Sequence, residues 1–286
     1  CQRCGLVYLN PRPTVQEIGA YYPTKRYHPF RALQQKDSFE PVASQRQNAK
    51  KITQIWGNPN GCHVLDVGCG SGLFLLAMRQ RGWQVHGVEP NQQAAEFAQN
   101  ILQLPVTNGD IFQVNQEKLF DVITFWDVLE HTHSPRDVLT QAHSLLNQNG
   151  LLVINVPNWS SLERKLFKTK WIAIDAPRHL YHFSPETITR LLQDCGFSVV
   201  EIGSKTPVMN PASNVLRALG TLLRNTRQVK PTAGNSPRQV VSSQSTSSLK
   251  RWLIRITYIL LTVPNFLVDV LGQGGSLVVY ARKRER

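Results

Sequence analysis

The stretch from His63 to Met78, HVLDVGCGSGLFLLAM, places three glycines within five residues, between an apolar run and a second apolar segment. An apolar strand that ends in glycines and continues into a helix is typical of the first turn of a doubly wound α/β fold, where ligands bind. Glycine lets the chain turn sharply and lets a ligand approach the bare backbone. A helix beginning near Ser71 would also point unpaired N–H groups at this ligand. The stretch therefore predicts both a fold class and a binding site.

The rest of the chain alternates between strand patterns and helix patterns. The predicted strands cover residues 62–67, 84–88, 105–107, 120–126, 150–156, 197–202 and 276–282, and the predicted helices cover 71–81, 91–103, 135–147 and 185–195. Ser184 and Pro185 fit the cap and first turn of the last helix. Because the strands are apolar on both faces and are separated by helices, we expect a mostly parallel sheet covered by helices.

Four segments of the chain differ in composition. Residues 1–37 are rich in Pro, Tyr and Arg and predict an irregular lead-in with one short helix over 14–21. Residues 38–203 form the predicted core. Residues 204–275 form an insertion with a Ser- and Pro-rich linker, because about 70 residues between two neighbouring strands exceed what a crossover needs. Residues 276–286 supply the last core strand and a basic tail.

Positive charge is concentrated toward the C-terminus. The chain has a formal net charge of +13, and residues 204–286 hold 13 basic and two acidic residues. Such a segment favours an anionic partner. Apolar residues at helical spacing over 249–263 favour a basic amphipathic helix on an anionic membrane surface, and a substrate lid or dimer face is an equal alternative. Nucleic acid is disfavoured, because no basic groove interleaved with aromatic residues is visible.

The five cysteines are odd in number and spread along the chain, so they do not form a disulfide framework. This usage suits a reducing compartment, and we expect a cytoplasmic protein that associates peripherally with a membrane. The chain begins with Cys1 and not Met, which suggests a fragment. Cys1 and Cys4 could form half of a tetrahedral zinc site, but no second pair is visible, so we expect no intact zinc site.

Two cofactor classes could use a glycine turn of this kind. Dinucleotide sites prefer a third glycine at the position where this chain has Leu73. Asp66, two residues before Gly68, would repel a phosphate group but would favour a cation such as the sulfonium of S-adenosylmethionine. The turn therefore favours a cationic nucleoside as the ligand.

The sequence VLDVGCGSG resembles the first motif of class I S-adenosylmethionine-dependent methyltransferases, and the resemblance extends over residues 62–202. It implies a Rossmann-like fold with a seven-stranded sheet whose last strand is antiparallel. It also implies that Glu89 binds both ribose hydroxyls, that Asp110 binds the adenine amino group, and that Ile111 packs on the adenine ring. The other cofactor residues that it implies are Asp66, Gly68, Gly70, Gly72 and Trp126, the last of which lies in the FWDVLEH motif facing the cofactor and substrate.

The cofactor carries the reactive methyl group, so the protein mainly has to align the reactants and exclude water. An oxygen nucleophile would also have to lose a proton, and His131 is the candidate base because it follows a strand at the mouth of the site. Asp127, Glu130 and His131 are spaced i, i+3 and i+4 and could face one divalent metal. Local capping by Glu130 is the favoured alternative, so we expect no metal there.

The segment APRHLYHFS, residues 176–184, resembles the RHL..FS segment of a broad quinol and small-molecule subgroup of these enzymes. Loops at that edge border the substrate pocket, so the substrate candidates are Arg178, His179, Tyr181 and His182. Capping within the loop is an alternative of equal weight. CQRCGLVYLNPRPT resembles the end of a zinc ribbon that precedes some members, and YYPTKRYH is expected to fold over the pocket.

These patterns predict an S-adenosylmethionine-dependent methyltransferase that acts on a small or lipophilic acceptor at a membrane surface. The alternatives are a catalytically inactive methyltransferase-like scaffold and an NAD(P)-dependent oxidoreductase. The intact Glu89 and Asp110 disfavour the scaffold, and Leu73 and Asp66 disfavour the oxidoreductase. Oxygen, carbon and nitrogen acceptors stay open, as does the oligomeric state.

Overall fold

The computed structural model describes residues 1–22, 39–115, 117, 119–206 and 267–284. Within them, seven strands form one sheet in the order β4-β3-β2-β5-β6-β9-β8. These strands are β2 (His63–Val67), β3 (Gln84–Glu89), β4 (Val106–Asn108), β5 (Phe120–Trp126), β6 (Leu146–Pro157), β8 (Phe197–Lys205) and β9 (Ser276–Lys283). β2 pairs in parallel with β3 and β5, whereas β9 runs antiparallel between β6 and β8. The predicted sheet is thereby confirmed, including its antiparallel last strand.

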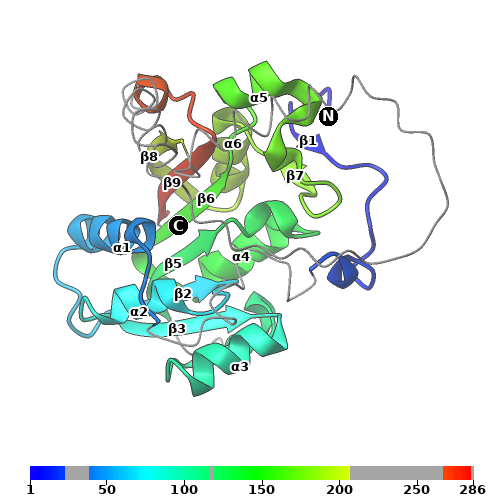
Figure 1. The fold of residues 1–286 in the computed structure, drawn as a ribbon. Helices are drawn as coiled ribbons and strands as arrows, with labels where there is room; N and C mark the ends of the chain where they lie inside the picture. Colours follow the sequence, from blue (N-terminus) through cyan, green and yellow to red (C-terminus); the bar gives the residue numbers. More distant parts are fainter. Residues whose placement is uncertain (23–38, 116, 118, 207–266, 285–286) are drawn as a thin grey trace, which may run out of the picture.

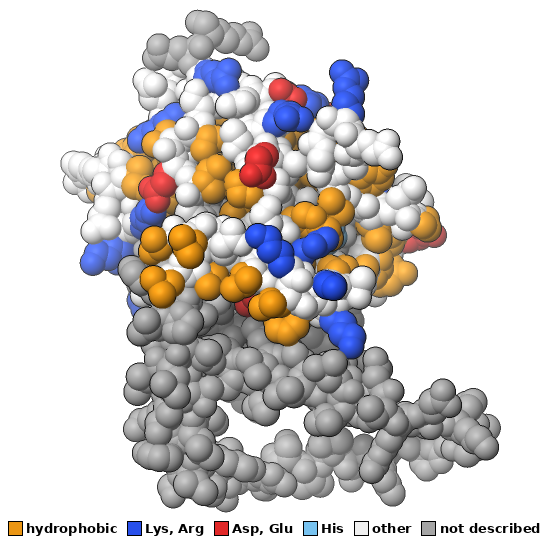
Figure 2. All heavy atoms as spheres, turned by 90° about the horizontal axis from the view of Figure 1, so that it is seen from above, with side chains coloured by type: hydrophobic (Ala, Val, Ile, Leu, Met, Phe, Trp, Pro, Cys, Tyr) orange, Lys and Arg blue, Asp and Glu red, His pale blue; other side chains and the backbone are white. Residues whose placement is uncertain are grey.

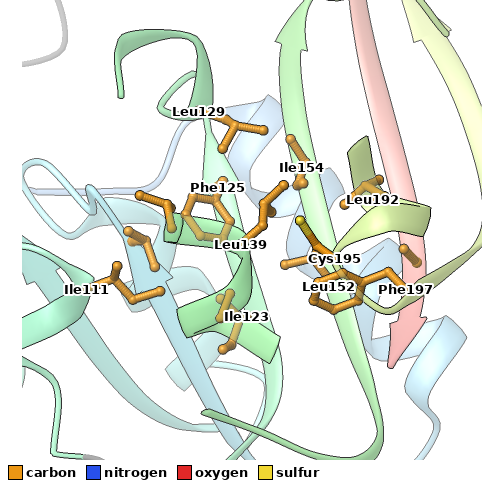
Figure 3. Close-up of a cluster of buried hydrophobic side chains, with 14 of the residues drawn as sticks. Ile111, Ile123, Phe125, Leu129, Leu139, Leu152, Ile154, Leu192, Cys195 and Phe197 are labelled. Atoms are coloured by element: carbon orange, nitrogen blue, oxygen red, sulfur yellow. The ribbon is translucent and has the colours of Figure 1, made fainter. Parts of the chain in front are cut away.

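Helices cover both faces of the sheet (Figure 1). One face carries α1 (Ala43–Trp56), α2 (Leu73–Arg79) and α3 (Gln92–Asn100), and the other carries α4 (Pro135–Leu145) and α6 (Pro185–Asp194). The strand side chains alternate between the two layers, as in β6, where Leu152 and Ile154 face α4 and α6 while Leu151 and Val153 face the other layer. Figure 3 shows the layer that α4 and α6 cover, to which Phe125, Leu139 and Leu192 belong.

The remaining short elements lie in the connections. They are β1 (Val7–Tyr8), β7 (Tyr181–His182), α5 (Leu162–Phe167) and five 3₁₀ turns, η1 (Ile18–Tyr21), η3 (Ile111–Gln113), η4 (Leu129–His131), η5 (Lys168–Lys170) and η6 (Ile172–Ile174). β1 pairs with β7, so the N-terminal segment is attached to the loop that holds the substrate candidates. The sequence predicted an irregular lead-in, and this pairing was not foreseen.

Several predicted boundaries differ from the structure for local reasons. α2 begins at Leu73 and not at residue 71, because Gly72 adopts a left-handed conformation with φ +80°. β6 begins at Leu146, although the polar residues that follow Leu146 are typical of a turn. Side chains of β9 bind backbone carbonyls in this part of the strand, and Lys283 Nζ lies 2.7 Å from the carbonyl oxygen of Leu146. The short helix predicted over 14–21 is only the 3₁₀ turn η1.

The long connection between β8 and β9 is the predicted insertion. Residues 207–266, including the stripe predicted over 249–263, lie outside the described residues. In the described ranges no helix combines the length and apolar content that crossing a membrane would require.

Candidate active site

The loop between β2 and α2 contains three glycines with positive φ. A Cβ atom at Gly68 would lie 2.6 Å from Val128 Cγ2, and one at Gly72 would lie 2.7 Å from Leu104 Cδ1. At Gly70, where φ is +55°, a Cβ would meet no atom of the described residues within 4 Å. The outer glycines are therefore required by the protein's own packing, whereas Gly70 faces open space at the carboxyl edge of the sheet, where a ligand can approach its backbone.

Glu89 lies at the end of β3, beside this loop, and it is buried. Its Oε2 accepts a 2.8 Å hydrogen bond from the Gly70 N–H, and its Oε1 accepts one of 2.8 Å from the Asn91 N–H. Burial raises the pKa of this carboxyl group, while the two N–H donors lower it. Each carboxylate oxygen can accept a further hydrogen bond, so the group suits two adjacent hydroxyls.

Asp66 is buried near the end of β2, where the Thr124 hydroxyl donates a 2.6 Å hydrogen bond to its Oδ1. Burial raises the pKa of Asp66 to about 8. Near pH 7 the group is therefore mostly protonated, whereas the sequence predicted a standing negative charge. A cation bound nearby would favour the ionised form.

Asp110 and Ile111 follow β4 and start the turn η3. Asp110 Oδ1 accepts a 2.9 Å hydrogen bond from the Phe112 N–H, so the carboxylate caps the turn. Ile111 is only 1% exposed and points into the core (Figure 3), while Phe112 is 50% exposed. This corrects the predicted role of Ile111: its side chain is a core residue and offers no free face to an adenine ring.

Trp126 ends β5, and its ring packs edge-to-face on Phe74 of α2 with 5.1 Å between centroids. Its buried Nε1 has no hydrogen-bond partner among the described residues. A buried indole N–H without an acceptor is unusual, so the position suits a ligand that carries one.

A compact cluster of Glu130, His131 and His179 lies next along the carboxyl edge. One ligand atom from each of the three side chains lies within 4.8 Å of the others. Glu130 and His131 belong to η4, which is anchored by the core residue Leu129 (Figure 3), and His179 comes from the loop before β7. The two segments are joined where the Leu180 N–H donates a 2.8 Å hydrogen bond to the Glu130 carbonyl. We call these three residues the Glu–His–His cluster.

His131 is held through its Nδ1 atom, which lies 3.0 Å from the Arg178 carbonyl oxygen and 2.8 Å from the Tyr22 hydroxyl. Because a carbonyl only accepts, this geometry favours a proton on Nδ1 and leaves the lone pair on Nε2. Burial, followed by the charge of His179, lowers the pKa of His131 to about 4. The imidazole is therefore neutral at pH 7, as the predicted base has to be.

The four substrate candidates of the 176–184 loop have different environments. Arg178 forms an ion pair with Asp175, with Nη2 and Oδ1 2.6 Å apart, and His179 belongs to the Glu–His–His cluster. His182 is buried against Trp159, with ring centroids 4.9 Å apart. Tyr181 instead contacts the N-terminal segment, where its hydroxyl accepts a 2.8 Å hydrogen bond from Arg12. The structure thus brings His179 and His182 together but not Tyr181.

Asp127 does not belong to this cluster, although its spacing suggested so. Its exposed carboxylate accepts a 2.6 Å hydrogen bond from Asn155 Nδ2. The backbone at Asp127 is left-handed, with φ 55°, so the three residues do not lie on one regular helical turn.

At the N-terminus, Cys1 and Cys4 are free thiols.

The sequence did not single out three aromatic residues near the cluster. The Tyr22 ring lies edge-to-face with His131 at 5.7 Å, and Trp159 packs against Trp171 at 6.1 Å. Tyr22 lies in the YYPTKRYH segment that was expected to cover the pocket, and of that segment residues 21 and 22 are described. The two tryptophans flank the basic segment 160–170. This combination of aromatic and basic residues is the sequence feature that could have pointed to them.

Comparison with known proteins agrees with this geometry. A family model described as "Methyltransferase domain" matches residues 42–202. The ubiquinone biosynthesis O-methyltransferase of Bradyrhizobium diazoefficiens is 26% identical over 152 residues, which make up 49% of this chain and 60% of that relative. The match thus spans less than two thirds of the relative's length.

Two solved structures share the fold. An S-adenosylmethionine-dependent methyltransferase from Archaeoglobus fulgidus superimposes with a TM-score of 0.51 and 21% identity, covering 84% of this chain and 94% of that one. The cyclase SpnF superimposes with a TM-score of 0.61 and 14% identity, covering 99% and 100%. The family match spans more than half of the chain and follows the predicted motifs in order, and this chain therefore belongs to the methyltransferase domain family, as its glycine loop predicted.

Proposed function

We propose that this chain transfers the methyl group of S-adenosylmethionine to a hydroxyl group on a small lipophilic acceptor. The observation that carries the proposal is the juxtaposition of Gly70, whose Cβ position is open, with Glu89, whose buried carboxylate hydrogen-bonds to that same loop. An open backbone beside a fixed carboxylate suits a nucleoside whose ribose has two adjacent hydroxyls.

The residues present fit this cofactor. Glu89 would hold the ribose hydroxyls, the backbone at Gly70 would lie against the ligand, and the unpartnered Trp126 Nε1 would donate to an acceptor atom. S-adenosylmethionine supplies a methyl group on a sulfonium, which needs no activation by the protein. Asp66 would ionise as the positive charge approaches, because its raised pKa is sensitive to a nearby cation.

The acceptor side combines apolar rings with hydrogen-bond acceptors. Trp159 and His182 pack together, and His182 lies 6.3 Å from His179 of the Glu–His–His cluster, measured between ring centroids. Aromatic walls with a few polar groups suit a largely apolar ligand that carries a hydroxyl. The relatives named ubiquinone biosynthesis O-methyltransferase act, by their name, on oxygen, and this supports the same acceptor atom here.

The hydroxyl has to lose its proton when its oxygen attacks the methyl carbon. In the simplest arrangement the neutral His131 accepts that proton at Nε2, while its Nδ1 stays bound to the Arg178 carbonyl. His131 is thus proposed to contact the acceptor, and Arg178 positions it through the backbone.

Calorimetry with S-adenosylhomocysteine, on the wild type and on Glu89→Ala, tests the cofactor assignment, with NADH as the competing ligand. We expect binding of the sulfur nucleoside that Glu89→Ala abolishes, and no binding of NADH. Transfer of a labelled methyl group to a short-chain catechol then tests the reaction. Binding without transfer to any hydroxylated probe would favour the scaffold alternative, and tight NADH binding alone would favour the oxidoreductase.

We further propose that the protein is cytoplasmic and binds an anionic membrane peripherally. The five cysteines are all free, which suits a reducing compartment. Around α5 the exposed apolar residues Leu166 and Leu271, 66% and 72% exposed, accompany Lys168 and Lys170. Figure 2 views the molecule from the α5 side and shows hydrophobic side chains interspersed with Lys and Arg. Such a mixture suits a surface of anionic lipid.

Vesicle flotation tests this second proposal. We expect the chain to float with vesicles that contain anionic lipid at low salt, and expect the charge reversal of Lys168 and Lys170 to glutamate to weaken flotation. Charge reversal of Arg79, which lies in α2 on the opposite side of the fold, is the matched control. Recovery of the wild type in the soluble fraction under these conditions would reject membrane association.

A further inference from the structure

Arg164 of α5 is a half-buried cation whose charge no acidic side chain of the described residues balances. Its guanidinium carbon lies over the Trp159 ring, 4.2 Å from the centroid. Its Nε atom is buried and has no hydrogen-bond partner in the part of the chain that the structure describes, and none of the ion pairs there includes it. A cation that loses hydration without gaining an anion is costly. Arg164 therefore suits a ligand that brings a negative charge.

The acidic residues in the same connection have other partners. Between the end of β6 and the start of β7 the chain contains two of them, Glu163 and Asp175. The side chain of Trp171 hydrogen-bonds to Glu163, and Asp175 forms its ion pair with Arg178. Neither carboxylate is therefore committed to the charge of Arg164.

The contact with Trp159 orients the guanidinium without balancing its charge. An aromatic ring attracts a cation through its face, but it carries no negative charge of its own. The guanidinium has five N–H donors in a planar fork, and this fork binds a carboxylate through two parallel hydrogen bonds. One guanidinium supplies one positive charge, which one carboxylate balances. The position of Arg164 thus favours a carboxylate as the ligand group.

A row of rings connects Arg164 to the acceptor side of the site. Trp159 packs on His182 with 4.9 Å between centroids, and His182 lies 6.3 Å from His179. His179 in turn lies 4.6 Å from His131, the proposed base. The charge of Arg164 is one of the causes that lower the pKa of His182, so these two side chains are close to each other. A ligand that lies along this row reaches both the base and the guanidinium.

His182 offers a second polar atom on the same row. The side chain is buried, and its Nδ1 has no hydrogen-bond partner within the described ranges. Burial lowers its pKa to about 4, so the ring is neutral at pH 7 and can carry its proton on Nδ1. In that tautomer His182 donates a hydrogen bond, which an oxygen of the ligand can accept.

We propose that Arg164 binds a carboxylate group of the methyl acceptor, and that the acceptor is therefore a hydroxylated, largely apolar carboxylic acid. This inference rests on the proposed function, because it names the substrate class of the same site. The apolar body of the acceptor lies along Trp159 and His182, between the hydroxyl at His131 and the carboxylate at Arg164. The ion pair forms and breaks no covalent bond, so Arg164 acts on binding and not on the methyl transfer itself.

A carboxylate that cannot be methylated tests the inference without turnover. The probe is phenylhexanoate, its uncharged match is phenylhexanamide, and each is titrated by calorimetry into the full chain with and without S-adenosylhomocysteine. We expect the carboxylate to bind the wild type at least about tenfold more tightly than the amide, because it gains charge-assisted hydrogen bonds. In Arg164→Gln the two affinities should differ by less than about twofold.

Two further variants make the result specific. Arg164→Met keeps an apolar stem over Trp159 and should lose the preference for the carboxylate as Arg164→Gln does, which keeps the test valid if one of them fails to fold. Lys165→Gln removes the neighbouring cation, whose Nζ lies 2.7 Å from Gln273 Oε1, and should keep the preference. Equal binding of acid and amide by the wild type, or a preference that both Arg164 variants retain, would overturn the proposal.

The phosphate groups of anionic lipid offer the same oxyanion chemistry, so flotation with anionic vesicles is measured on the same variants. Arg164→Gln should float as the wild type does, because the proposed membrane contact is made by Lys168, Lys170 and their apolar neighbours. If Arg164→Gln weakens flotation and leaves the preference for phenylhexanoate unchanged, Arg164 binds lipid and the proposal is wrong.

Methyl transfer separates this proposal from the proposed function. The acceptors are a catechol that carries an alkyl carboxylate and the matching catechol amide. We expect the wild type to show a lower KM for the acid at a similar kcat, and Arg164→Gln to raise the KM for the acid alone. Equal KM values in the wild type would reject the carboxylate site while the function stands. If neither catechol is methylated but phenylhexanoate binding still depends on Arg164, the function fails and the carboxylate site stands.

Discussion

The backbone N–H of Gly70 donates a 2.8 Å hydrogen bond to Oε2 of Glu89, so one carboxylate connects the loop after β2 to the end of β3. Glu89 also accepts the N–H of Asn91, which caps α3 through its own side chain. The glycine loop, the acid and the start of α3 are therefore held as one unit. Ligand affinity and loop geometry should respond together when this unit is changed.

Gly70→Ala should separate binding from stability. The added methyl group would enter the open space at the loop, and the left-handed backbone would cost about 1–2 kcal/mol. We expect affinity for S-adenosylhomocysteine to fall by more than about tenfold, which corresponds to about 1.4 kcal/mol, because the methyl group would occupy the space through which the ligand approaches the backbone. Gly72→Ala should destabilise the fold more, since its Cβ would lie 2.7 Å from Leu104 and 3.1 Å from Ala98. Calorimetry and thermal unfolding of both variants provide the comparison, and wild-type affinity in Gly70→Ala would contradict the open-site assignment.

Glu89→Gln should weaken the same ligand without unfolding the protein. The amide retains one acceptor oxygen, but its NH₂ group would face either the Gly70 or the Asn91 N–H, donor against donor. We expect a loss of about 2–3 kcal/mol in binding, in the range of a hydrogen bond to a charged group. Glu96→Gln, on the exposed face of α3, is the control and should bind normally.

Asp66 should make cofactor affinity depend on pH. Its pKa of about 8 means that it is mostly neutral at pH 7, and a sulfonium binds better to the ionised form. The ratio of affinities for S-adenosylmethionine and neutral S-adenosylhomocysteine should therefore rise between pH 6.5 and 9, estimated from that pKa. Asp66→Asn should flatten the ratio. A ratio that stays constant with pH in the wild type would show that Asp66 does not sense the positive charge.

His182 should limit stability in acid. Burial lowers its pKa from 6.5 to about 4, so between these values the unfolded chain binds a proton that the folded chain does not. Stability is therefore complete above pH 6.5 and is lost as the pH falls toward 4, by up to roughly 3 kcal/mol. His182→Phe, which keeps a ring against Trp159, should retain more stability at pH 4.5 than the wild type does. Urea unfolding at pH 7 and 4.5 measures the difference, and His133→Phe should leave it unchanged.

Tyr22 should act as a positioning residue for His131. Tyr22→Phe removes the hydroxyl that lies 2.8 Å from Nδ1 but keeps the ring, so His131 would lose one of its two anchors. We expect the rate of methyl transfer to fall by about tenfold, the equivalent of one neutral hydrogen bond. Affinity for S-adenosylhomocysteine should not change. Tyr21→Phe, at the preceding exposed tyrosine, is the matched control. Equal rates for the two variants would exclude the positioning role.

The cofactor half of the site was predictable because its signals are local. Gly68, Gly70 and Gly72 follow one strand and Glu89 ends the next, and the ends of adjacent parallel strands meet at one edge of the sheet. Ile111 was misassigned because a short turn gives no period from which to tell its buried side from its exposed side. The protonation of Asp66 depends on how deeply its neighbours bury it, which no spacing encodes.

The acceptor half depends on contacts between distant segments. Tyr22 and His131 are 109 residues apart, and the Arg178 carbonyl that fixes His131 is 47 residues further along. The i, i+3, i+4 spacing of Asp127, Glu130 and His131 suggested one helical face, but the left-handed backbone at Asp127 turns the chain and His179 takes the third place. His179 takes the place predicted for Asp127 only in the tertiary structure, because no spacing along the chain relates His179 to Glu130 and His131.

Asp269 connects the two ends of the long segment between β8 and β9. Its carbonyl accepts a 2.9 Å hydrogen bond from the Ser204 hydroxyl, and its Oδ1 accepts one of 2.7 Å from the Thr206 hydroxyl. The two ends of this segment are therefore hydrogen-bonded to each other at the point where the chain leaves β8 and returns to β9. Because these hydrogen bonds fix the spacing of the two ends, a change in the length of the intervening segment need not disturb the pairing of β8 with β9.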